Sequence, residues 1–494
     1  MKPLTVVIPH YPEPFFEQTL LPLTKLTLVE GVVVVGQNPV SLEIPKCRVL
    51  VAGPLSSHET LELILEELRT KYLLLLRGGQ PISIEPGALE RLVQTAESTN
   101  AGIVYSNFFE ETKDGKSRHP LIDYQSGSVR DDFDFGAMML LSVPAVRMAL
   151  KKYGVIPSVK YAGLYDLRLK ISIEHAIHHL PEPLYSVSKT AASSSDEKLF
   201  SYVDPRNEAV QKEMEMVFMD YLKKIGAYLP PHQLRKVEQE SSPFPVEASV
   251  VIPVKNRKET IADAVKSALA QETDFPCNVI VVDNHSTDGT TRVLSDLAGR
   301  YSNIRHVVPV RTELGIGGCW NEALQNAACG RYAVQLDSDD LYSSNHTLKK
   351  IVDMLRQGNF AMVIGSYTLV DSRMEKIPPG LIDHREWTDE NGHNNALRIN
   401  GLGAPRAFNT ALMRAIGFLN VSYGEDYAAA LRICREYRIG RIYDSLYLCR
   451  RWPGNTDAGL TLEAANRNDV FKDKIRTDEI HARQMIAKRN AQSA

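Results

Sequence analysis

The sequence lacks the features that mark several large classes of protein. Its 6 cysteines are scattered and form no C-x-x-C pair, which argues against a zinc site or a disulfide framework. The longest apolar runs, such as 72–76, are far shorter than the roughly 18 residues that cross a bilayer. The chain opens on a strand pattern instead of a signal peptide. We therefore expect a cytoplasmic protein in a reducing compartment, with any membrane contact peripheral.

The sequence also has no excess of charge of one sign. Its 57 basic and 60 acidic residues give a net charge of −3, so no general attraction draws nucleic acid to it. We expect no nucleic-acid partner. With 494 residues, the chain is too long for a single core, and its 44% hydrophobic content is ordinary for a globular protein.

What the sequence does contain is an internal repeat. The text Thr5–Pro9 recurs almost unchanged as Ser249–Pro253. The apolar runs that begin at Tyr72 and Tyr332 lie 260 residues apart, and Asp166 and Asp426 have the same separation. Order and spacing hold over most of each half, so a tandem duplication is the simplest account.

Each copy alternates short apolar runs with amphipathic helical stretches. In the second copy the expected strands are 248–252, 278–282, 304–308 and 332–336. Continuous apolar strands separated by helices predict an α/β fold with a mixed, mostly parallel sheet that is covered on both faces. We expect two such domains at 1–190 and 246–458, a mostly helical linker at 191–245, and a helical tail at 459–494.

The linker and the tail have their own patterns. Ala192–Ser195 is typical of a loop, and Pro205–Ile225 has the apolar spacing of a helix. The tail, Leu462–Arg489, is helical and highly charged. Its basic residues are compatible with contact to a membrane face, but a solvated or oligomer-forming helix is favoured. A homo-oligomer is therefore one possible state of the protein.

Polar motifs of the second copy follow the strands, at the edge where ligands bind in such sheets. Asp283–Gly289 directly follows one strand and has the short polar side chains that hold a base and a ribose. The same residues also cap helices, and the two interpretations are equally supported. Asp337–Asp340 places three carboxylates within four residues, which indicates a hard divalent metal or else a solvated turn.

Two further motifs carry functional side chains. Glu425 and Asp426 precede a helix, where a carboxylate serves either as a general base or as a partner of the helix dipole. Arg450 and Arg451 follow the last strand-like run, where they clamp a diphosphate or form a basic surface turn. None of these motifs is decisive singly, and their order along one domain carries the weight.

This ordered series, across roughly 247–457, resembles the family-two glycosyltransferases of GT-A fold. Ser249–Arg257 is similar to the opening strand and nucleotide loop, Val282–Thr290 to the second nucleotide turn, Gly315–Asn321 to the glycine-rich stretch, and Asp337–Asp340 to the D-x-D element. The resemblance implies a nucleotide-sugar donor. The residues implied to bind it are Pro253, Val254, Asn256, Arg257, Asp283, Asn284, Gly317, Asn321, Asp337, Ser338, Arg450 and Arg451.

The resemblance also implies an inverting transfer. Asp426, beside Glu425, is the implied general base, and Arg406 and Trp452 lie on the acceptor side. Mn²⁺ or Mg²⁺ is implied at Asp339, with Asp340 as the alternate ligand. A histidine that many members place after the last strand is missing, so Asp457 or water is the candidate for completing the metal shell. A UDP-sugar is favoured over a GDP-sugar, and the acceptor is a glycan, a lipid-linked sugar or a protein.

The first copy has the same pattern of strands and helices but lacks many of these motif residues. Arg77–Gln80 stands where the second copy has Asp337–Asp340, and Tyr165 replaces the glutamate beside the retained Asp166. We interpret it as a degenerate domain that binds acceptor or a partner, or supports a dimer. The rival is a bifunctional enzyme with a second, metal-independent site, in which Arg77 replaces the cation and Asp131, Asp132 and Asp134 serve the chemistry.

Three histidines of the first copy invite a metal interpretation. His175, His178 and His179 fall on an expected helix, with His175 and His179 four residues apart. No carboxylate pattern accompanies them, so a packed or surface role is favoured.

Two other functions compete with the transferase. A nucleotidyltransferase needs a glycine-rich basic loop after its first strand, and Pro253–Arg257 contains no glycine. A non-catalytic nucleotide-sugar-binding scaffold is opposed by the intact acidic motifs, because clustered carboxylates without a ligand destabilise a fold. Metal-dependent binding of a nucleotide diphosphate would separate these functions.

Overall fold

The chain forms two units, each with its own sheet and core. The computed structural model describes residues 2–11, 15–39, 42–77, 79–113, 115–188, 207–238, 243–452, 454–455 and 459–493. Unit 1 comprises Met1–Tyr228 together with Thr461–Ala494, and unit 2 comprises Leu229–Leu460. The predicted loop at Ala192–Ser195 lies outside the described residues. Among the described helices, none combines the length and the apolar character needed to cross a bilayer.

Unit 1 contains a seven-stranded sheet and a smaller four-stranded sheet. The large sheet has the order β10-β6-β9-β4-β1-β2-β3 and the small one the order β5-β11-β7-β8. The strands are β1 (Leu4–Pro9), β2 (Val29–Gly36), β3 (Cys47–Val51), β4 (Tyr72–Leu76), β5 (Ile82–Ile84), β6 (Ile103–Ser106), β7 (Phe108–Thr112), β8 (Gly115–His119), β9 (Met138–Ser142), β10 (Ile177–Leu180) and β11 (Tyr185–Ser188).

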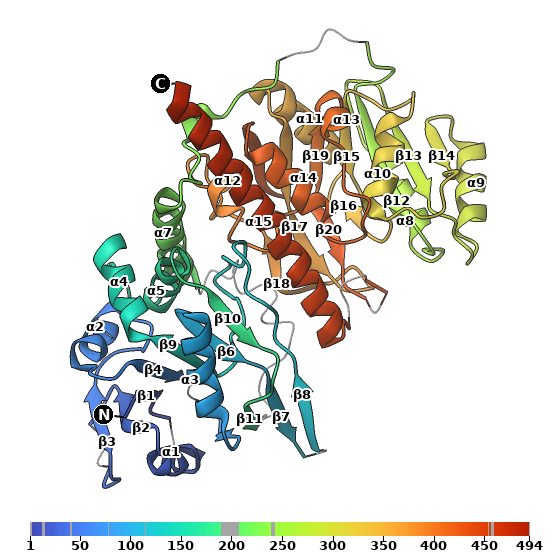
Figure 1. Ribbon diagram of the computed structural model, residues 1–494. Coiled ribbons are helices and arrows are strands. Elements are labelled where there is room, and N and C mark those ends of the chain that lie inside the picture. The colour runs from blue at the N-terminus through green and yellow to red at the C-terminus, as the bar shows by residue number, and fades with distance from the viewer. Residues whose placement is uncertain are drawn as a thin grey trace. The chain divides into compact units, whose positions relative to one another are not determined.

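Several helices of unit 1 pack against these strands (Figure 1). Ser57 and Ser142 begin two of them, because each serine hydroxyl accepts an N–H of the first turn that has no partner within the helix. The helices are α1 (Phe15–Lys25), α2 (His58–Glu67), α3 (Ala88–Thr99), α4 (Val143–Tyr153), α5 (Gly163–Ser172), α7 (Glu208–Lys224) and α15 (Leu462–Ser493).

Unit 2 is built around a nine-stranded sheet. The order is β14-β13-β12-β15-β19-β17-β20-β16, with β18 paired to β17. The strands are β12 (Ala248–Val254), β13 (Cys277–Asp283), β14 (Ile304–Val307), β15 (Tyr332–Gln335), β16 (Leu341–Tyr342), β17 (Met362–Val370), β18 (Lys376–Ile382), β19 (Arg406–Asn409) and β20 (Ile439–Arg450).

The central strands of unit 2 are buried apolar runs, as in β12 and β13, and helices cover them (Figure 1). The helices are η3 (Pro231–Gln233), α8 (Ile261–Leu269), α9 (Thr290–Arg300), α10 (Ile316–Gln325), α11 (Thr347–Gly358), α12 (Gly392–Asn395), α13 (Thr410–Ile416) and α14 (Glu425–Cys434). The predicted α/β class with mixed sheets is confirmed. The expectation of a mostly parallel sheet holds for the large sheet of unit 1. The sheet of unit 2 has as many antiparallel as parallel strand pairs.

The two large sheets have the same topology. Seven strands of unit 1, β3-β2-β1-β4-β9-β6-β10, correspond in order to β14-β13-β12-β15-β19-β17-β20 of unit 2. In both sheets the strand that follows the first four, β9 or β19, is antiparallel to both neighbours. The last strand of each series is parallel to the one beside it. The shared order is the structural counterpart of the sequence repeat.

The expected linker and tail do not form separate segments, because α7 and α15 belong to unit 1. The Glu213 carboxylate of α7 accepts the backbone N–H groups of residues 160–162, where α5 begins. On α15, the Thr477 hydroxyl accepts the Gly127 N–H, and a Cβ added at Gly127 would lie 2.1 Å from the Asp473 carbonyl oxygen. A charged helical pattern in the sequence does not reveal such docking.

The prediction that the tail is a solvated or oligomer-forming helix was wrong for part of its basic residues. Arg476 and Arg483 are buried and form ion pairs within α15, with Asp473 at 2.9 Å and Glu479 at 2.8 Å. Asp473 also accepts a hydrogen bond from the Ser128 hydroxyl at 2.7 Å. Spacing alone shows that opposite charges can meet on a helix, but not that they do so inside a core.

The helical placement of the three histidines was also wrong. His178 and His179 lie on strand β10, and His175 precedes that strand. Neighbouring residues of a strand point to opposite faces, so the spacing that suits a helix does not bring these imidazoles together. The His179 ring contacts Asp123 and Asn107 instead, at 2.7 Å and 2.8 Å.

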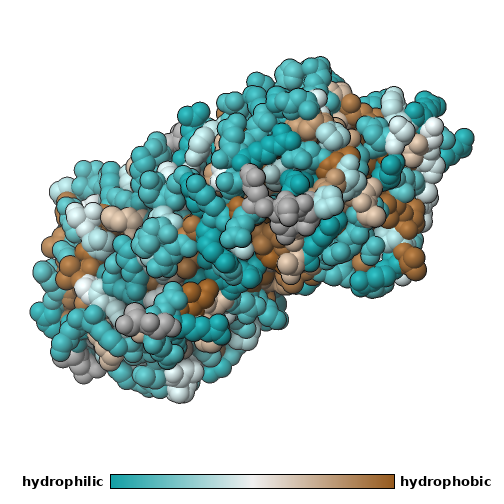
Figure 2. All heavy atoms as spheres, turned by 90° about the horizontal axis from the view of Figure 1, so that it is seen from above, coloured by the Kyte–Doolittle hydropathy of each residue, from teal (hydrophilic) through white to brown (hydrophobic). Residues whose placement is uncertain are grey.

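The surface seen in Figure 2 is mostly hydrophilic. Its hydrophobic residues form small groups between charged and polar ones. Scattered apolar residues of this kind are ordinary on the surface of a globular fold.

Candidate active site

The functional side chains predicted for unit 2 gather at one edge of its sheet. Strands β12, β13 and β15 are parallel neighbours, so their carboxyl ends meet at this edge. The loops that leave them carry Asn256 and Arg257, Asp283 and Asn284, and the acidic turn 337–340. Pro253 and Val254 are the last two residues of β12, on the same edge.

Asp283 ends β13 as a fully buried carboxylate. It accepts the Ser286 N–H at 3.0 Å and the Thr291 hydroxyl at 2.6 Å, and His306 Nε2 lies 3.5 Å away. Burial by itself raises the pKa of Asp283, but His306, Ser286 and Thr291 outweigh burial and hold this pKa below its usual range. Asp283 is therefore ionised at neutral pH.

The loop after β12 is tied to the loop after β13. Asn256 has a φ of 55°, its N–H donates to the Ser286 hydroxyl at 2.9 Å, and its side-chain oxygen accepts the Thr287 N–H at 2.8 Å. Asn284 donates from Nδ2 to the Leu314 carbonyl at 2.7 Å. Its buried Oδ1 has no hydrogen-bond partner among the described residues, so this acceptor is left for a ligand.

The acidic turn after β15 is held by surrounding side chains. Gln335 Nε2 donates to both carboxylate oxygens of Asp337, at 3.0 Å and 3.1 Å. Asp340 accepts the Arg450 N–H at 2.7 Å. Asp339 accepts the Trp452 indole N–H at 3.0 Å, and Arg257 Nε lies 3.6 Å from the same oxygen.

Negative charge is in excess at this turn. Burial is the largest cause that raises the pKa values of Asp337 and Asp340, and repulsion from neighbouring carboxylates of the turn adds to it. A cation would relieve this repulsion, and carboxylate oxygens are the ligands that Mg²⁺ and Mn²⁺ prefer. The donor set therefore fits a divalent metal.

The third ligand of such a metal is not evident from the described part of the chain. There, histidine, cysteine and carboxylate side chains form no cluster of three or more with metal-binding geometry. Asp457, the sequence-based candidate, lies outside the described residues.

The first turn of α14 places two more carboxylates near this turn. Asp426 Oδ2 forms an ion pair with Arg406 Nη1 at 2.7 Å, and the Asp426 side chain is 31% exposed. The positive charge of Arg406 also lowers the pKa of Asp337, against the larger effect of burial. The Arg406 N–H donates to Gln335 Oε1 at 3.1 Å, so Arg406 bridges α14 and the acidic turn through Gln335.

Glu425 differs from its neighbour. Its carboxyl is buried, and its Oε2 has no hydrogen-bond partner among the described residues. Burial raises the pKa of Glu425 to about 8, and the Asp426 carboxylate adds to the shift. Glu425 is consequently protonated over most of the neutral range, whereas Asp426 faces solvent.

The glycine-rich stretch has a packing role. A Cβ at Gly317 would lie 1.9 Å from the Leu419 carbonyl oxygen and 3.0 Å from the Glu425 Cβ. Only glycine allows α10 to approach these groups so closely. Asn321 exchanges two hydrogen bonds of 2.9 Å with the Phe418 backbone, and this amide is thereby committed to the loop that precedes α14.

The last strand completes the site with its C-terminal residues. Arg450 is buried, its Nη2 lies 3.8 Å from Asp263, and its Nε has no hydrogen-bond partner among the described residues. The Arg451 N–H donates to the Val370 carbonyl at 2.7 Å. Ser338 accepts the Thr260 hydroxyl at its carbonyl oxygen, 3.0 Å away, so its backbone holds the acidic turn against the start of α8.

Sequence reasoning missed two residues that support the acidic turn. Gln335 orients Asp337, and the buried Tyr447 hydroxyl accepts the Asp337 N–H at 2.8 Å. Gln335 is the one amide in an otherwise apolar strand, a signal that the sequence did offer. Tyr447 is recognisable only in the fold, because 110 residues separate it from its partner.

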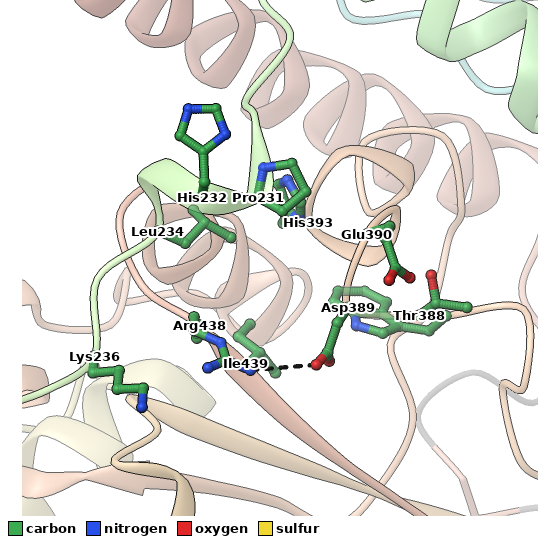
Figure 3. A pocket seen from close by; sticks show the side chains of 11 residues that line it. Pro231, His232, Leu234, Lys236, Thr388, Asp389, Glu390, His393, Arg438 and Ile439 are labelled. Atoms are coloured by element: carbon green, nitrogen blue, oxygen red, sulfur yellow. Dashed lines mark hydrogen bonds and ion pairs between the residues drawn. The ribbon is translucent and has the colours of Figure 1, made fainter.

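A hollow of about 390 Å³ in unit 2 lies where β20 begins, at the opposite end of this strand from Arg450. His232, Asp389 and Arg438 are among its lining residues, and Arg438 donates to Asp389 at 3.3 Å (Figure 3). No predicted site residue lines this hollow. The acidic turn and this hollow are therefore separate features of unit 2.

Part of unit 2 is similar in sequence to known glycosyltransferases. Residues 249–416 match the model of the family described as glycosyl transferase family 2. The Haloferax volcanii protein named glycosyltransferase AglJ is 35% identical over 40% of this chain and 51% of its own length. The Escherichia coli enzyme WfgD, named as a UDP-Glc:alpha-D-GlcNAc-diphosphoundecaprenol beta-1,3-glucosyltransferase, is 25% identical over 41% of this chain and 76% of its own length.

These similarities are partial. The chain spans only 29% of the length of uncharacterised mycobacterial proteins that it matches at 33% identity. Among solved structures, S. aureus TarS 1-349 in complex with UDP-GlcNAc is 21% identical, with a TM-score of 0.36 over 48% of this chain and 72% of that chain.

Proposed function

We propose that unit 2 transfers a sugar from a nucleotide-diphosphate sugar to an acceptor hydroxyl, with inversion at the anomeric carbon. Residues 249–416, which match the model of glycosyl transferase family 2, support this proposal. The observation that carries the proposal is the meeting of two groups at one sheet edge. The acidic turn 337–340 lies on one side, and Arg406 joins it to the solvent-accessible Asp426 on the other.

The donor binds along the loops after β12 and β13 in this proposal. Asp283 is ionised and already holds Ser286 and Thr291, so it shapes the turn, while the free Oδ1 of Asn284 accepts a donor N–H of the base. An N–H donor of this kind is present on a uracil edge, and a UDP-sugar is the donor that we favour. Arg257 and Arg450 supply the positive charge that a diphosphate requires.

A divalent cation, Mn²⁺ or Mg²⁺, would be held by Asp339, with Asp340 beside it. When bound, such an ion offsets the negative charge that develops on the departing diphosphate. The chain itself prepares this position, because Trp452 and Arg257 orient the Asp339 carboxylate and the Arg450 backbone orients Asp340.

Asp426 is the general base of the proposed reaction. It takes the proton of the acceptor hydroxyl, whose oxygen then attacks the anomeric carbon from the face opposite the nucleotide. The bond to the nucleotide diphosphate breaks as the new bond forms, and inversion follows. Glu425 holds its proton at neutral pH, so it contributes a neutral neighbour to Asp426 and not a second base.

The acceptor presents a hydroxyl and is a glycan, a lipid-linked sugar or a protein side chain. Unit 1 has no second transferase site in this proposal. Its Asp166, the counterpart of Asp426, is buried and forms an ion pair with Lys170 at 2.7 Å, so it is not available to an acceptor.

The test is the release of nucleotide diphosphate from a panel of UDP- and GDP-sugars with Mn²⁺, using the full chain. Wild type should turn over one donor class, and NMR of the product should show an anomeric configuration opposite to that of the donor. Asp426→Asn should abolish transfer while nucleotide binding, measured by calorimetry, persists. Retention of configuration, or full activity in Asp426→Asn, would overturn the mechanism. Nucleotide-sugar binding without turnover would favour the non-catalytic scaffold, and absence of any nucleotide binding would overturn the proposed function.

A further inference from the structure

Unit 1 contains a cavity at the sheet edge that corresponds to the active site of unit 2. The cavity measures about 200 Å³ and begins at Leu75 and Leu76, the last residues of β4. Phe133, Phe135 and Met139 contribute further apolar walls. A space of this size is below the roughly 300–1,000 Å³ of sites for drug-sized ligands, so its occupant is small.

The cavity is the apolar counterpart of the acidic site. Leu75 stands 260 residues before Gln335, and Arg77 and Tyr165 stand 260 residues before Asp337 and Glu425. At each of these positions, a polar or acidic side chain of unit 2 is replaced by an apolar, aromatic or basic one in unit 1.

The pairing register of the strands identifies a fourth pair of corresponding positions in the two units. Met139 of β9 pairs with Tyr105, the third residue of β6, just as Arg406 of β19 pairs with Ile364, the third residue of β17. Met139 therefore occupies the place of the arginine that bridges the acidic turn and α14 in unit 2. The cavity has lost the groups that would hold a metal and a diphosphate.

The charged side chains of the cavity give it a positive balance. Two guanidinium groups, Arg77 and Arg168, line it together with one carboxylate, Asp131. Arg77 is exposed to solvent. Gln211 Nε2 lies 3.5 Å from the Asp131 carboxylate, so this carboxylate is already engaged with α7.

Arg168 is the unusual member of this set. It is 6% exposed and has no ion-pair partner in the described part of the chain. Its guanidinium lies 4.8 Å from the Tyr165 ring and 5.4 Å from the Phe135 ring, and its Nη2 donates to the Arg130 carbonyl at 2.9 Å. Its buried Nε has no hydrogen-bond partner among the described residues. A buried cation with an unused donor is a ready partner for an anion.

We propose that this cavity binds a small amphiphilic anion, an apolar chain or ring that carries one carboxylate or phosphate group. The apolar body occupies the space between Leu75, Phe133 and Met139, and the anionic group faces Arg168 and Arg77. The net excess of one positive charge selects a single anionic group. This site is independent of the proposed transferase activity, because it uses only residues of unit 1.

The connector helix α7 forms part of the same site. Met214 lines the cavity, and the adjacent Glu213 caps the start of α5 by accepting the N–H groups of residues 160–162. Tyr161 and Tyr165, which flank that start, also line the cavity. A ligand in this cavity would therefore lie beside Met214 of α7.

The experiment is calorimetric titration of the full chain with four probes of equal chain length: octanoate, octyl phosphate, octanol and octylammonium. Octanoate or octyl phosphate should bind with a stoichiometry of one, and about tenfold or more tightly than octanol. Which of the two binds better distinguishes a carboxylate from a phosphate ligand. Equal affinity for octanol, or preference for octylammonium, would overturn the proposal.

Variants locate the binding. Arg77→Met, at an exposed position, should weaken the anions several-fold and leave octanol unchanged, and Arg168→Met should weaken them further. Ala137→Phe, which fills the cavity, should abolish binding of all probes, with circular dichroism as the check on folding. Arg91→Met, an exposed arginine of α3 that pairs with Glu182, is the matched control and should bind like wild type. Undiminished anion binding in both Arg77→Met and Ala137→Phe would place it elsewhere and refute the assignment.

Discussion

In both units a buried tyrosine hydroxyl accepts a backbone N–H at the functional edge of the sheet. Tyr185 accepts the Ala137 N–H in unit 1, and Tyr447 accepts the Asp337 N–H in unit 2, each at 2.8 Å. The N–H that Tyr185 accepts precedes β9, whereas the N–H that Tyr447 accepts follows β15. Around these two anchors the side chains are opposite in chemistry, apolar and cationic in unit 1 but acidic in unit 2. The difference shows that one arrangement of backbone can carry either an acidic or an apolar and cationic site. A few side chains at the strand ends determine which of the two is present.

Close packing of the site helix is achieved differently in the two units. In unit 2 the glycine lies on α10, where a Cβ at Gly317 would meet the Leu419 carbonyl oxygen at 1.9 Å. In unit 1 it lies on α5, where a Cβ at Gly163 would meet the Ser56 carbonyl oxygen at 2.6 Å. Two segments therefore approach each other closely in both units. The glycine that allows this approach can lie on either segment.

The largest expected effect is on sugar transfer, and it comes from a change in the acidic turn of unit 2. Asp339→Asn should reduce sugar transfer by about 1,000-fold, because it removes one negative charge from the position proposed to hold the cation. Turnover with Mn²⁺ measures this. Asp353→Asn, the same change in an ion pair on α11, is the control and should retain wild-type activity. If Asp339→Asn were as active as this control, the proposal that unit 2 carries the transferase site would be wrong.

The next effect concerns packing and can be measured in unit 2 alone, because the 3 tryptophans of the sequence, Trp320, Trp387 and Trp452, all lie there. Gly317→Ala should lower the free energy of unfolding of unit 2 by about 2–3 kcal/mol, since its Cβ meets backbone atoms. Denaturant titration followed by tryptophan emission measures the loss. Gly299→Ala, on α9 with open space around it, should be neutral or stabilising by up to about 1 kcal/mol.

A pH effect should distinguish the buried acids of the two units. Glu425 has a pKa of about 8 in the folded protein against 4.5 in the unfolded chain, so the fold binds its proton more tightly. The free energy of unfolding of unit 2 should therefore fall as pH rises from 4.5 to 8 and then level off. Burial raises the pKa of Asp166 to about 6 from 3.8, which confines the corresponding loss in unit 1 to lower pH.

Glu425→Gln mimics the protonated form and should remove this slope. At pH 8 the variant should be more stable than wild type by up to about 4 kcal/mol, and at pH 4.5 the two should be nearly equal. Tryptophan-detected denaturation at several pH values measures both quantities. Asp444→Asn, an exposed carboxylate of unit 2, is the control, and an unchanged slope in Glu425→Gln would assign the effect to another group.

The smallest expected effect tests the support of the acidic turn. Trp452→Phe removes the N–H that Asp339 accepts at 3.0 Å but keeps an aromatic ring beside Arg257. The Mn²⁺ concentration for half-maximal turnover should rise about tenfold, with little change at saturation. Tyr301→Phe, an exposed ring of unit 2, provides the comparison. A loss of maximal turnover at saturating Mn²⁺ would instead give Trp452 a direct contact with the substrate.

Much of the fold could be predicted from local patterns. The runs at 72–76 and 332–336 are apolar at every position or nearly so, and both form buried central strands, β4 and β15. The acidic turn and the Glu425–Asp426 pair were found because clustered carboxylates after a strand or before a helix are conspicuous. The three histidines were misplaced because a spacing of four residues was taken for helix, whereas Ile177–Leu180 pairs in the sheet.

The sequence by itself determined the alternation of strands and helices, the internal repeat and the acidic motifs of the second copy, because each is written in residues close together along the chain. Only the tertiary structure decided that Asp426 is paired with Arg406, that Glu425 keeps its proton, and that α15 belongs to unit 1. It also decided that the counterpart edge in unit 1 encloses a cavity. The physical reason is that burial and charge pairing depend on residues hundreds of positions apart, which only folding brings into contact.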